Sequence, residues 1–319
     1  MGSVPAEIDG SGEGRLLMQR RYVTVDVFTD AVFGGNPLAV VLDAAGLAPG
    51  RMQAIAAEFN YAETTFVLPA RGAGNTAHVR IFTPRSEVPF AGHPNVGTAV
   101  VLARELEAQG NSPTDLLLFE EAAGLVPMRV LREGGLVIGA ELRAPEPLTT
   151  RSLASAQDAA DCLSLSPSDI ELAIHPPQVL SVGLPFLVVE VASREALRRA
   201  RPNVAAHERI LPSIGTDAVY AYCRGSRPEE LHARMFSPLD GIVEDPATGS
   251  AAAATISRLA ALRSEPDASI AWRIEQGIEM GRPSLLLGRT EKHGGAVTAV
   301  HVAGRAVPVM HGFLNVPPG

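Results

Sequence analysis

The feature that most constrains the fold of this chain is an imperfect repeat of two short blocks. Gly-Asn-Pro-Leu-Ala-Val-Val at 35–41 is matched by Gly-Leu-Pro-Phe-Leu-Val-Val at 183–189, and Arg-Ile-Phe-Thr-Pro at 80–84 is matched by Arg-Met-Phe-Ser-Pro at 234–238. The blocks recur in the same order, which indicates duplication, and a spacing of about 150 residues is too long for a solenoid. The repeat therefore predicts two similar domains of mixed α and β structure within the 319 residues.

Local patterns set the expected boundaries of these two domains. Residues 22–28 alternate Val and Phe with polar residues, as a half-buried strand does, and segments with helical spacing follow. The stretch 147–168 is rich in Ala, Ser, Thr and Asp and is the expected connection between the halves. We therefore expect a flexible leader over 1–20, an N-terminal domain over 21–147 and a C-terminal domain over 148–319.

Composition indicates a globular protein and disfavours several kinds of partner. Hydrophobic residues make up 46% of the chain and charged residues 19%, so material for a core is ample. A net charge of -8 without a run of Lys or Arg disfavours nucleic acid and anionic membranes, and the apolar stretches are too short to span a bilayer. The first twenty residues lack the apolar segment of a secretion signal, so we expect a cytoplasmic protein.

Two segments combine small and hydroxyl residues at the expected starts of helices. In Gly-His-Pro at 92–94 a proline is placed at the first helical position, and Thr-Gly-Ser at 248–250 offers hydroxyls at a comparable place. A helix N-terminus exposes backbone N–H groups and the positive end of the helix dipole, which suit a carboxylate. Ordinary capping explains either segment alone, but their repetition favours two anion-binding helix starts that face one cleft.

Two carboxylates lie where side chains can reach such a cleft. Glu63 falls between the expected end of a helix and the start of a strand. Apolar surroundings would raise the pKa of its carboxyl towards neutrality, which suits a group that takes and returns a proton, whereas a solvated loop would leave it an ordinary surface residue. Asp245 either orients a substrate amine or hydroxyl or serves as a turn residue before proline.

Other chemistry has little support in the sequence. Gly-Ala-Gly-Asn-Thr-Ala at 72–77 formally fits a dinucleotide-binding pattern, but a strand-like segment follows it where a helix is needed. The phosphate-binding loop, the zinc-protease motif and the nucleophile elbow are absent from the sequence. Cys162 and Cys223 have no metal-ligand spacing, so we expect two buried free thiols and no metal site.

Four ordered motifs resemble those of the PhzF (phenazine biosynthesis) family. They are N-Y-A-E-T-T-F-V at 60–67, R-I-F-T-P-x-x-E-V-P-F-A-G-H-P at 80–94, V-E-D-P-A-T-G-S-A at 243–251 and Q-G-x-E-M-G-R-P-S at 276–284. The resemblance extends from about Tyr22 to the C-terminus. It implies the diaminopimelate-epimerase-like fold, an α+β (mixed α/β) fold in which two similar domains each wrap a curved mixed sheet around a central helix. It also implies an active site between the domains and, commonly, a homodimer.

By motif, the resemblance places the catalytic roles on Glu63, His93 and Asp245. In the family the glutamate moves a proton between carbons of a dihydro-hydroxyanthranilate, and the histidine and aspartate contact the substrate. Related epimerases and racemases use two opposed cysteines at the helix starts, where this chain has Ala91 and Thr248. Two-thiol racemisation is therefore disfavoured, because both the acid and the base thiol would be missing.

We therefore expect an isomerase of secondary metabolism that needs no metal, flavin or nicotinamide, phenazine biosynthesis being the family's best-known setting. Glu63 would take a proton from a small cyclic amino-carboxylate and return it at another carbon. Backbone N–H groups near Gly92, Thr248, Gly249 and Ser250 would bind the substrate carboxylate. Two alternatives stay open: a carboxylate-binding accessory protein without catalysis, and an epimerase that uses a single carboxylate base.

Overall fold

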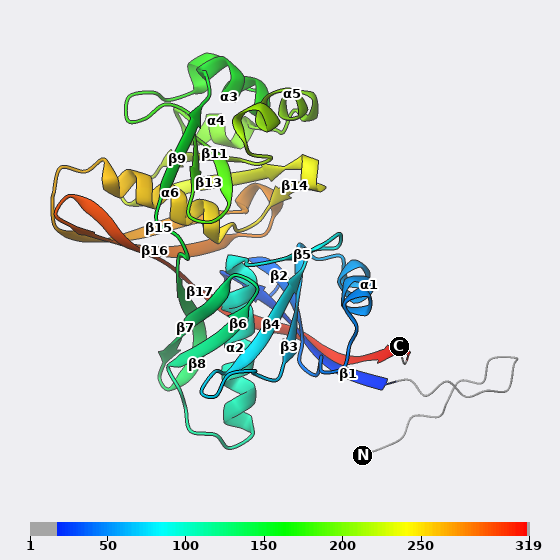
Figure 1. Ribbon diagram of the computed structural model, residues 1–319. Helices are drawn as coiled ribbons and strands as arrows, with labels where there is room; N and C mark the ends of the chain where they lie inside the picture. The colour runs from blue at the N-terminus through cyan, green and yellow to red at the C-terminus, as the bar shows by residue number, and fades with distance from the viewer. Residues whose placement is uncertain (1–17, 318–319) are drawn as a thin grey trace, which may run out of the picture.

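The computed structural model describes residues 18–317 and shows two lobes connected by a long C-terminal strand (Figure 1). Residues 1–17 of the predicted leader lie outside the described part. Residues 18–20, which the sequence assigned to the leader, are instead the beginning of the first strand, where they pair with the end of the chain.

Within residues 18–317, the first lobe consists of eight strands and two helices. Its strands are β1 (Met18–Val27), β2 (Asn36–Val41), β3 (Glu63–Leu68), β4 (Ala77–Phe82), β5 (Glu87–Val88), β6 (Leu116–Glu121), β7 (Gly124–Glu133) and β8 (Leu136–Arg143). Its helices are α1 (Pro49–Phe59) and α2 (Gly92–Ala108).

The second lobe repeats this arrangement and adds an outer helical layer. Its strands are β9 (Thr149–Leu153), β10 (Gln178–Ser181), β11 (Pro185–Glu190), β12 (Val219–Arg224), β13 (Glu230–Ser237), β14 (Ile242–Asp245), β15 (Ala268–Gln276) and β16 (Ser284–His293). Its helices are α3 (Ala156–Leu163), α4 (Arg194–Arg199), α5 (Val204–Ile214) and α6 (Gly249–Ala261). The last strand is β17 (Ala296–Val316).

Strand pairing confirms the duplication that the sequence predicts. In the first lobe the parallel pairs are β2–β3 and β4–β6. The pairs β1–β2, β3–β4, β6–β7 and β7–β8 are antiparallel. The series β10–β11, β11–β12, β12–β13, β13–β15, β15–β16 and β16–β17 follows the same pattern. The repeated sequence blocks fall on the equivalent strands, with 35–41 on β2, 183–189 on β11, and the Arg-x-Phe blocks on β4 and β13.

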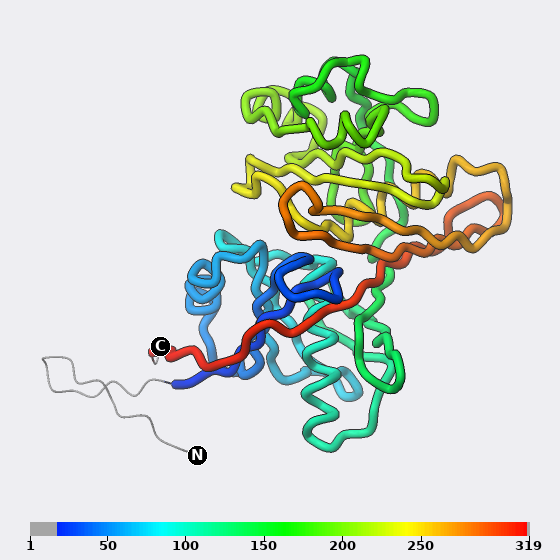
Figure 2. The backbone as a smooth tube through the Cα atoms, turned by 180° about the vertical axis from the view of Figure 1, so that it is seen from behind, coloured from blue at the N-terminus to red at the C-terminus, as the bar shows by residue number. Residues whose placement is uncertain are grey.

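The strand β17 belongs to both lobes. It pairs with β16 in the second lobe and with β8 and β1 in the first, so the two ends of the described chain lie side by side (Figure 2). Residues 306–316, which the sequence assigned to the C-terminal domain, therefore pair with the first strand of the N-terminal one. The division at 147 and 148 stays a prediction, and the final strand crosses it.

Each lobe wraps its sheet around one buried helix. Every residue of α2 from 93 to 103 is buried, as is expected of a helix that is enclosed on all sides. A Cβ atom on Gly97 would lie 2.6 Å from a Leu38 methyl and 2.8 Å from a Val27 methyl, so a glycine lets α2 approach β1 and β2. In the second lobe α6 takes the same central place, and α3, α4 and α5 cover the opposite face of the sheet. None of the helices in the described residues is long and apolar enough to cross a membrane.

Candidate active site

The starts of α2 and α6 lie against each other where the two lobes meet. A Cβ atom on Gly92 would lie 3.6 Å from the Gly249 Cα atom and 3.8 Å from the Ser250 backbone nitrogen. A methyl group at position 92 would therefore already be in van der Waals contact with the other helix. The repeat predicted two facing helix starts, and the structure brings them together.

Neither helix start carries a side-chain cap. The N-cap residues are Ala91 and Thr248, and neither side chain accepts a hydrogen bond from the first turn of its helix. The prediction of a proline at the first helical position is wrong, because α2 begins two residues earlier, at Gly92. Uncapped N–H groups at both helix starts favour the anion-binding interpretation over ordinary capping.

Glu63 and His93 form a close pair beside these helix starts. Asn60 ends α1 in the left-handed conformation (φ 53°), and the chain then turns so that Glu63 is the first residue of β3. The His93 Nε2 and Glu63 Oε2 atoms are 3.4 Å apart, and the two side chains are 7% and 17% exposed. Neither atom has a hydrogen-bond partner among the described residues.

Burial shifts the pKa of both groups so that they are mostly uncharged at neutral pH. Burial, with a smaller contribution from the nearby Asp245 charge, raises the pKa of Glu63 to about 8. Burial lowers the pKa of His93 to about 3. The pair is therefore a carboxylic acid next to a neutral imidazole, and the acid loses its proton within reach of physiological pH.

Asp245 is held by hydrogen bonds from both lobes. The Asn36 amide of the first lobe donates to Asp245 Oδ1 at 2.8 Å, and the Thr248 hydroxyl donates to Oδ2. Burial raises the pKa of Asp245 to about 6, with these two hydrogen bonds opposing the shift. Asp245 is accordingly mostly ionised at neutral pH while Glu63 is mostly protonated, so the two carboxyls have different chemical capacities.

Gln276 fixes the backbone next to Asp245 and was missed by sequence reasoning. Its amide donates to the Asp245 carbonyl at 2.8 Å and to the Thr248 hydroxyl at 3.1 Å, and it accepts from the Thr248 backbone N–H at 3.2 Å. Gln276 is the first residue of the fourth family motif. That position was the available signal, but no local pattern shows which residues it contacts.

Arg282, from the same motif, connects the second lobe to the loop that carries Asn36. Its guanidinium donates to Asp26 Oδ1 at 2.6 Å and to the carbonyls of Gly34 and Gly35 at 2.7 Å each. Gly35 has φ +59°, and a Cβ atom there would lie 2.2 Å from the Val27 carbonyl oxygen, so only glycine fits. The arginine therefore positions the residue that binds Asp245.

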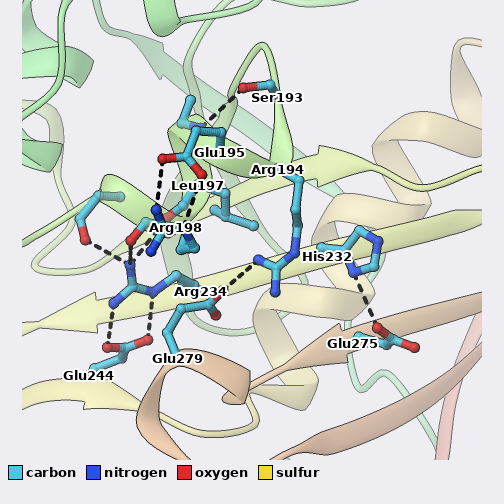
Figure 3. A network of polar contacts seen from close by, with 12 residues as sticks. Ser193, Arg194, Glu195, Leu197, Arg198, His232, Arg234, Glu244, Glu275 and Glu279 are labelled. Carbon is cyan, nitrogen blue, oxygen red and sulfur yellow. Dashed lines mark hydrogen bonds and ion pairs between the residues drawn. The ribbon is translucent and has the colours of Figure 1, made fainter.

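A second arginine supports the strand that ends in Asp245. Figure 3 shows Arg234 of β13 between the Glu244 carboxylate and backbone carbonyls at the end of α4. Its Nε and Nη2 atoms each donate to Glu244 at 2.7 Å, and Nη1 donates to the Ala200 carbonyl at 2.7 Å. This buried two-point ion pair holds β14, and thus the residue after Glu244, in place.

An apolar pocket adjoins the two helix starts. It is lined by Phe90, Gly92, Leu142, Ala144, Pro145, Val182, Gly183, Leu184, Gly249, Ser250, Ala253 and Val302. Gly92, Gly249 and Ser250 are thus shared with the predicted site, whereas Glu63, His93 and Asp245 are not among the lining residues.

The two cysteines lie away from the helix starts. Both are buried free thiols, Cys162 on α3 and Cys223 on the face of β12 that packs under the outer helices. Burial raises the pKa of Cys162 to about 12 and that of Cys223 to about 11, so neither is a ready thiolate.

The duplicated lobes, each with a sheet wrapped around one buried helix, define an epimerase-like fold. The family model described as phenazine biosynthesis-like protein matches residues 25–312. An uncharacterized isomerase of Mesorhizobium japonicum is 40% identical over 94% of this chain and 100% of its own length. The trans-2,3-dihydro-3-hydroxyanthranilate isomerase of Pseudomonas fluorescens is 37% identical over 92% of this chain and 98% of its own length. The crystal structure of a PhzF-family protein from Bacillus anthracis matches this one with a TM-score of 0.83, over 94% of this chain and 100% of that chain, and the two sequences are 25% identical. This chain belongs to the PhzF family and is an isomerase, which confirms the expected fold and enzyme class.

Proposed function

We propose that this enzyme moves a proton, and with it a double bond, between carbons of a small cyclic amino-carboxylate of the dihydro-hydroxyanthranilate type, with Glu63 as acid and base and no cofactor. The observation that carries the proposal is the buried pair of Glu63 and His93 beside two uncapped helix starts. The relatives named as dihydro-hydroxyanthranilate isomerases support the substrate class.

The helix starts give the substrate carboxylate its place. Backbone N–H groups at the beginnings of α2 and α6, around Gly92, Gly249 and Ser250, bind this anion from both lobes. Hydrogen bonds to the carboxylate stabilise the extended dienolate that forms when an adjacent C–H bond is broken. The carboxylate is thus both the recognition element and the electron acceptor during the reaction.

Proton transfer then needs only one group. Ionised Glu63 takes the proton from carbon, the electron pair of the C–H bond passes into the conjugated system, and the protonated Glu63 returns the proton at another carbon of that system. The product is an isomer of the substrate, so no external oxidant, reductant or co-reactant is required. His93 lies next to the Glu63 carboxyl and Asp245 supplies a fixed negative charge. The predicted homodimer and cytoplasmic location remain predictions.

The pH dependence of kcat/KM follows from the base having to be ionised. Because the pKa of Glu63 is raised to about 8 and that of Asp245 to about 6, kcat/KM rises with pH from 5 to 9, and the two carboxyls titrate as a coupled pair. A kcat/KM that falls as pH rises from 5 to 9 would contradict the role of Glu63 as the base.

Proton NMR in D2O tests the proposal with trans-2,3-dihydro-3-hydroxyanthranilate and a panel of related cyclic amino-carboxylates. We expect the wild type to move the double bond and to place deuterium on carbon, and Glu63→Gln to bind the same compounds with turnover lowered by about 10²–10⁴-fold. Glu58→Gln, the same change at an exposed position of α1, is the matched control and keeps full activity. Binding without exchange by the wild type would indicate an accessory protein, and exchange confined to one stereocentre would indicate an epimerase.

A further inference from the structure

Several buried polar atoms around the candidate site have no hydrogen-bond partner among the described residues. Glu63 Oε2, His93 Nε2 and Asn36 Oδ1 belong to residues already placed there, and the neighbouring Thr64 and Asn95 also carry such atoms. A further one is the hydroxyl of Tyr220, a fully buried residue of β12 in the second lobe. The sequence gives this tyrosine no role, and neither the proton transfer nor the carboxylate site uses it.

Strand register places Tyr220 on the same face of the sheet as Asp245. Tyr220 is directly opposite Met235 on β13, and Met235 is directly opposite Asp245 on β14. Directly paired residues point to the same face, so the three side chains form a row across three strands. Tyr220 packs in the core around α6, whereas its neighbours Val219 and Ala221 pack under the outer helices.

The Tyr220 hydroxyl is a donor that lies near the Asp245 charge. Burial and the Asp245 charge both raise the pKa of this phenol, so it keeps its proton. The two Asp245 oxygens accept from Asn36 and Thr248. The Tyr220 hydroxyl has no acceptor among the described residues.

Tyr222 shows how the same strand treats a phenol that has only a structural role. It is buried, and it lies two residues further along on the same face. Its hydroxyl donates to Glu190 Oε2 at 2.7 Å and lies 2.7 Å from His175 Nε2. Where a buried phenol is part of the framework, this chain gives it partners, as buried polar groups require.

We propose that the Tyr220 hydroxyl donates a hydrogen bond to a hydroxyl group of the substrate, bound on the Asp245 side of the site. This assignment rests on the proposed function for the position of the site. An ammonium has no lone pair to accept from Tyr220, and a carboxylate would be repelled by Asp245. A substrate hydroxyl can accept a hydrogen bond from Tyr220 and can donate one in turn. The Asn36 side chain, whose amide nitrogen donates to Asp245, offers Oδ1 as an acceptor without a partner among the described residues. Tyr220 is thus a specificity-determining residue.

The test compares Tyr220→Phe with Tyr222→Phe on a hydroxylated substrate and on the matched compound that lacks only the hydroxyl. We expect Tyr220→Phe to lower kcat/KM for trans-2,3-dihydro-3-hydroxyanthranilate by about 10–100-fold. The same variant should change kcat/KM for the compound without the hydroxyl by less than about twofold. Its melting temperature should be equal to that of the wild type or higher, because the unpaired hydroxyl is removed. Tyr222→Phe lowers the melting temperature and keeps the wild-type preference for the hydroxylated compound.

Two results would overturn the assignment of Tyr220. Equal losses on both compounds would show a packing effect, and a lower melting temperature with unchanged kcat/KM would show a structural hydroxyl. If the wild type turns over neither compound, the proposed reaction fails, and calorimetric affinities of the same pair for the same variants replace the kinetic ratio. A wild type that does not prefer the hydroxylated compound in either measurement contradicts the role of Tyr220.

Discussion

Two buried polar regions of this molecule differ in how completely their atoms are paired. In the second lobe, Tyr222, Glu190 and His175 form a chain in which the phenol bonds to both neighbours. In the first lobe, Glu63 and His93 are 3.4 Å apart with no hydrogen bond for the facing atoms. Unpaired buried polar atoms occur in both lobes, but the candidate site gathers several of them on neighbouring residues, among them Glu63, His93 and Asn36.

Leaving such atoms unpaired has a cost in stability. Each buried donor or acceptor without a partner costs about 1–3 kcal/mol of the free energy of unfolding. Sites that bind and react with a ligand commonly carry this kind of penalty, whereas framework networks do not. Changes in the framework should therefore lower stability, and a change that relieves the site should raise it.

The largest effect is expected when the paired region around Arg234 is broken. Arg234→Met removes the two-point ion pair with Glu244 and the hydrogen bond to the Ala200 carbonyl, and the Arg234 side chain is only 3% exposed. We expect the free energy of unfolding to fall by about 3–5 kcal/mol in urea denaturation, because a buried carboxylate loses its partner. A loss below about 1 kcal/mol would show that the network is not structural.

The opposite sign is expected for Glu63→Gln. Because the pKa of Glu63 is raised from 4.5 to about 8, the folded state binds more protons than the unfolded state between these values, and stability falls as pH rises through this window. The glutamine variant lacks this loss, so we expect it to be about 1–3 kcal/mol more stable than wild type at pH 8 and equal to it at pH 4. Denaturation curves at both pH values check this, and a variant less stable at pH 8 would refute it.

A smaller loss is expected for the arginine that joins the lobes. Arg282→Met removes an ion pair with Asp26 and two bonds to carbonyls, but the Arg282 side chain is 28% exposed, so water screens the pair. We expect about 1–2 kcal/mol in thermal denaturation, together with a lower kcat/KM because the loop with Asn36 loosens. Unchanged kcat/KM in a folded variant would show that this loop does not position the site.

The smallest effect is expected at the surface, where Arg198→Ala is the control for both arginines. Arg198 pairs with Glu195 on the same helix, and both side chains are largely exposed. Such pairs contribute at most about 0.5 kcal/mol, so urea denaturation and kcat/KM should match wild type. A loss as large as that of Arg234→Met would mean that exposed and buried pairs are equivalent here.

The sequence predicted the elements with local signals and missed the contacts made at long range. The repeated blocks located the duplicated lobes, and Glu63 was expected at the helix-to-strand junction where it lies. The sequence did not reveal the roles of Gln276, Arg282 and Tyr220. These roles depend on strand register and on contacts between the two lobes. Such contacts join residues far apart in the sequence; Asn36 and Asp245, for example, are 209 residues apart. The return of β17 to β1 was missed for the same reason: nothing local in the final strand shows which strands it pairs with.

Burial and the Asp245 charge keep Glu63 protonated at neutral pH, and the proposed reaction depends on this raised pKa. Carbon-13 NMR of protein labelled at glutamate carboxyls measures this directly, with the Glu63→Gln variant identifying the signal. We expect a titration midpoint near 8 in the absence of ligand, set by burial and the Asp245 charge. A midpoint near the ordinary value of 4.5 would show an ionised, solvated carboxylate and would rule out a buried acid at this position.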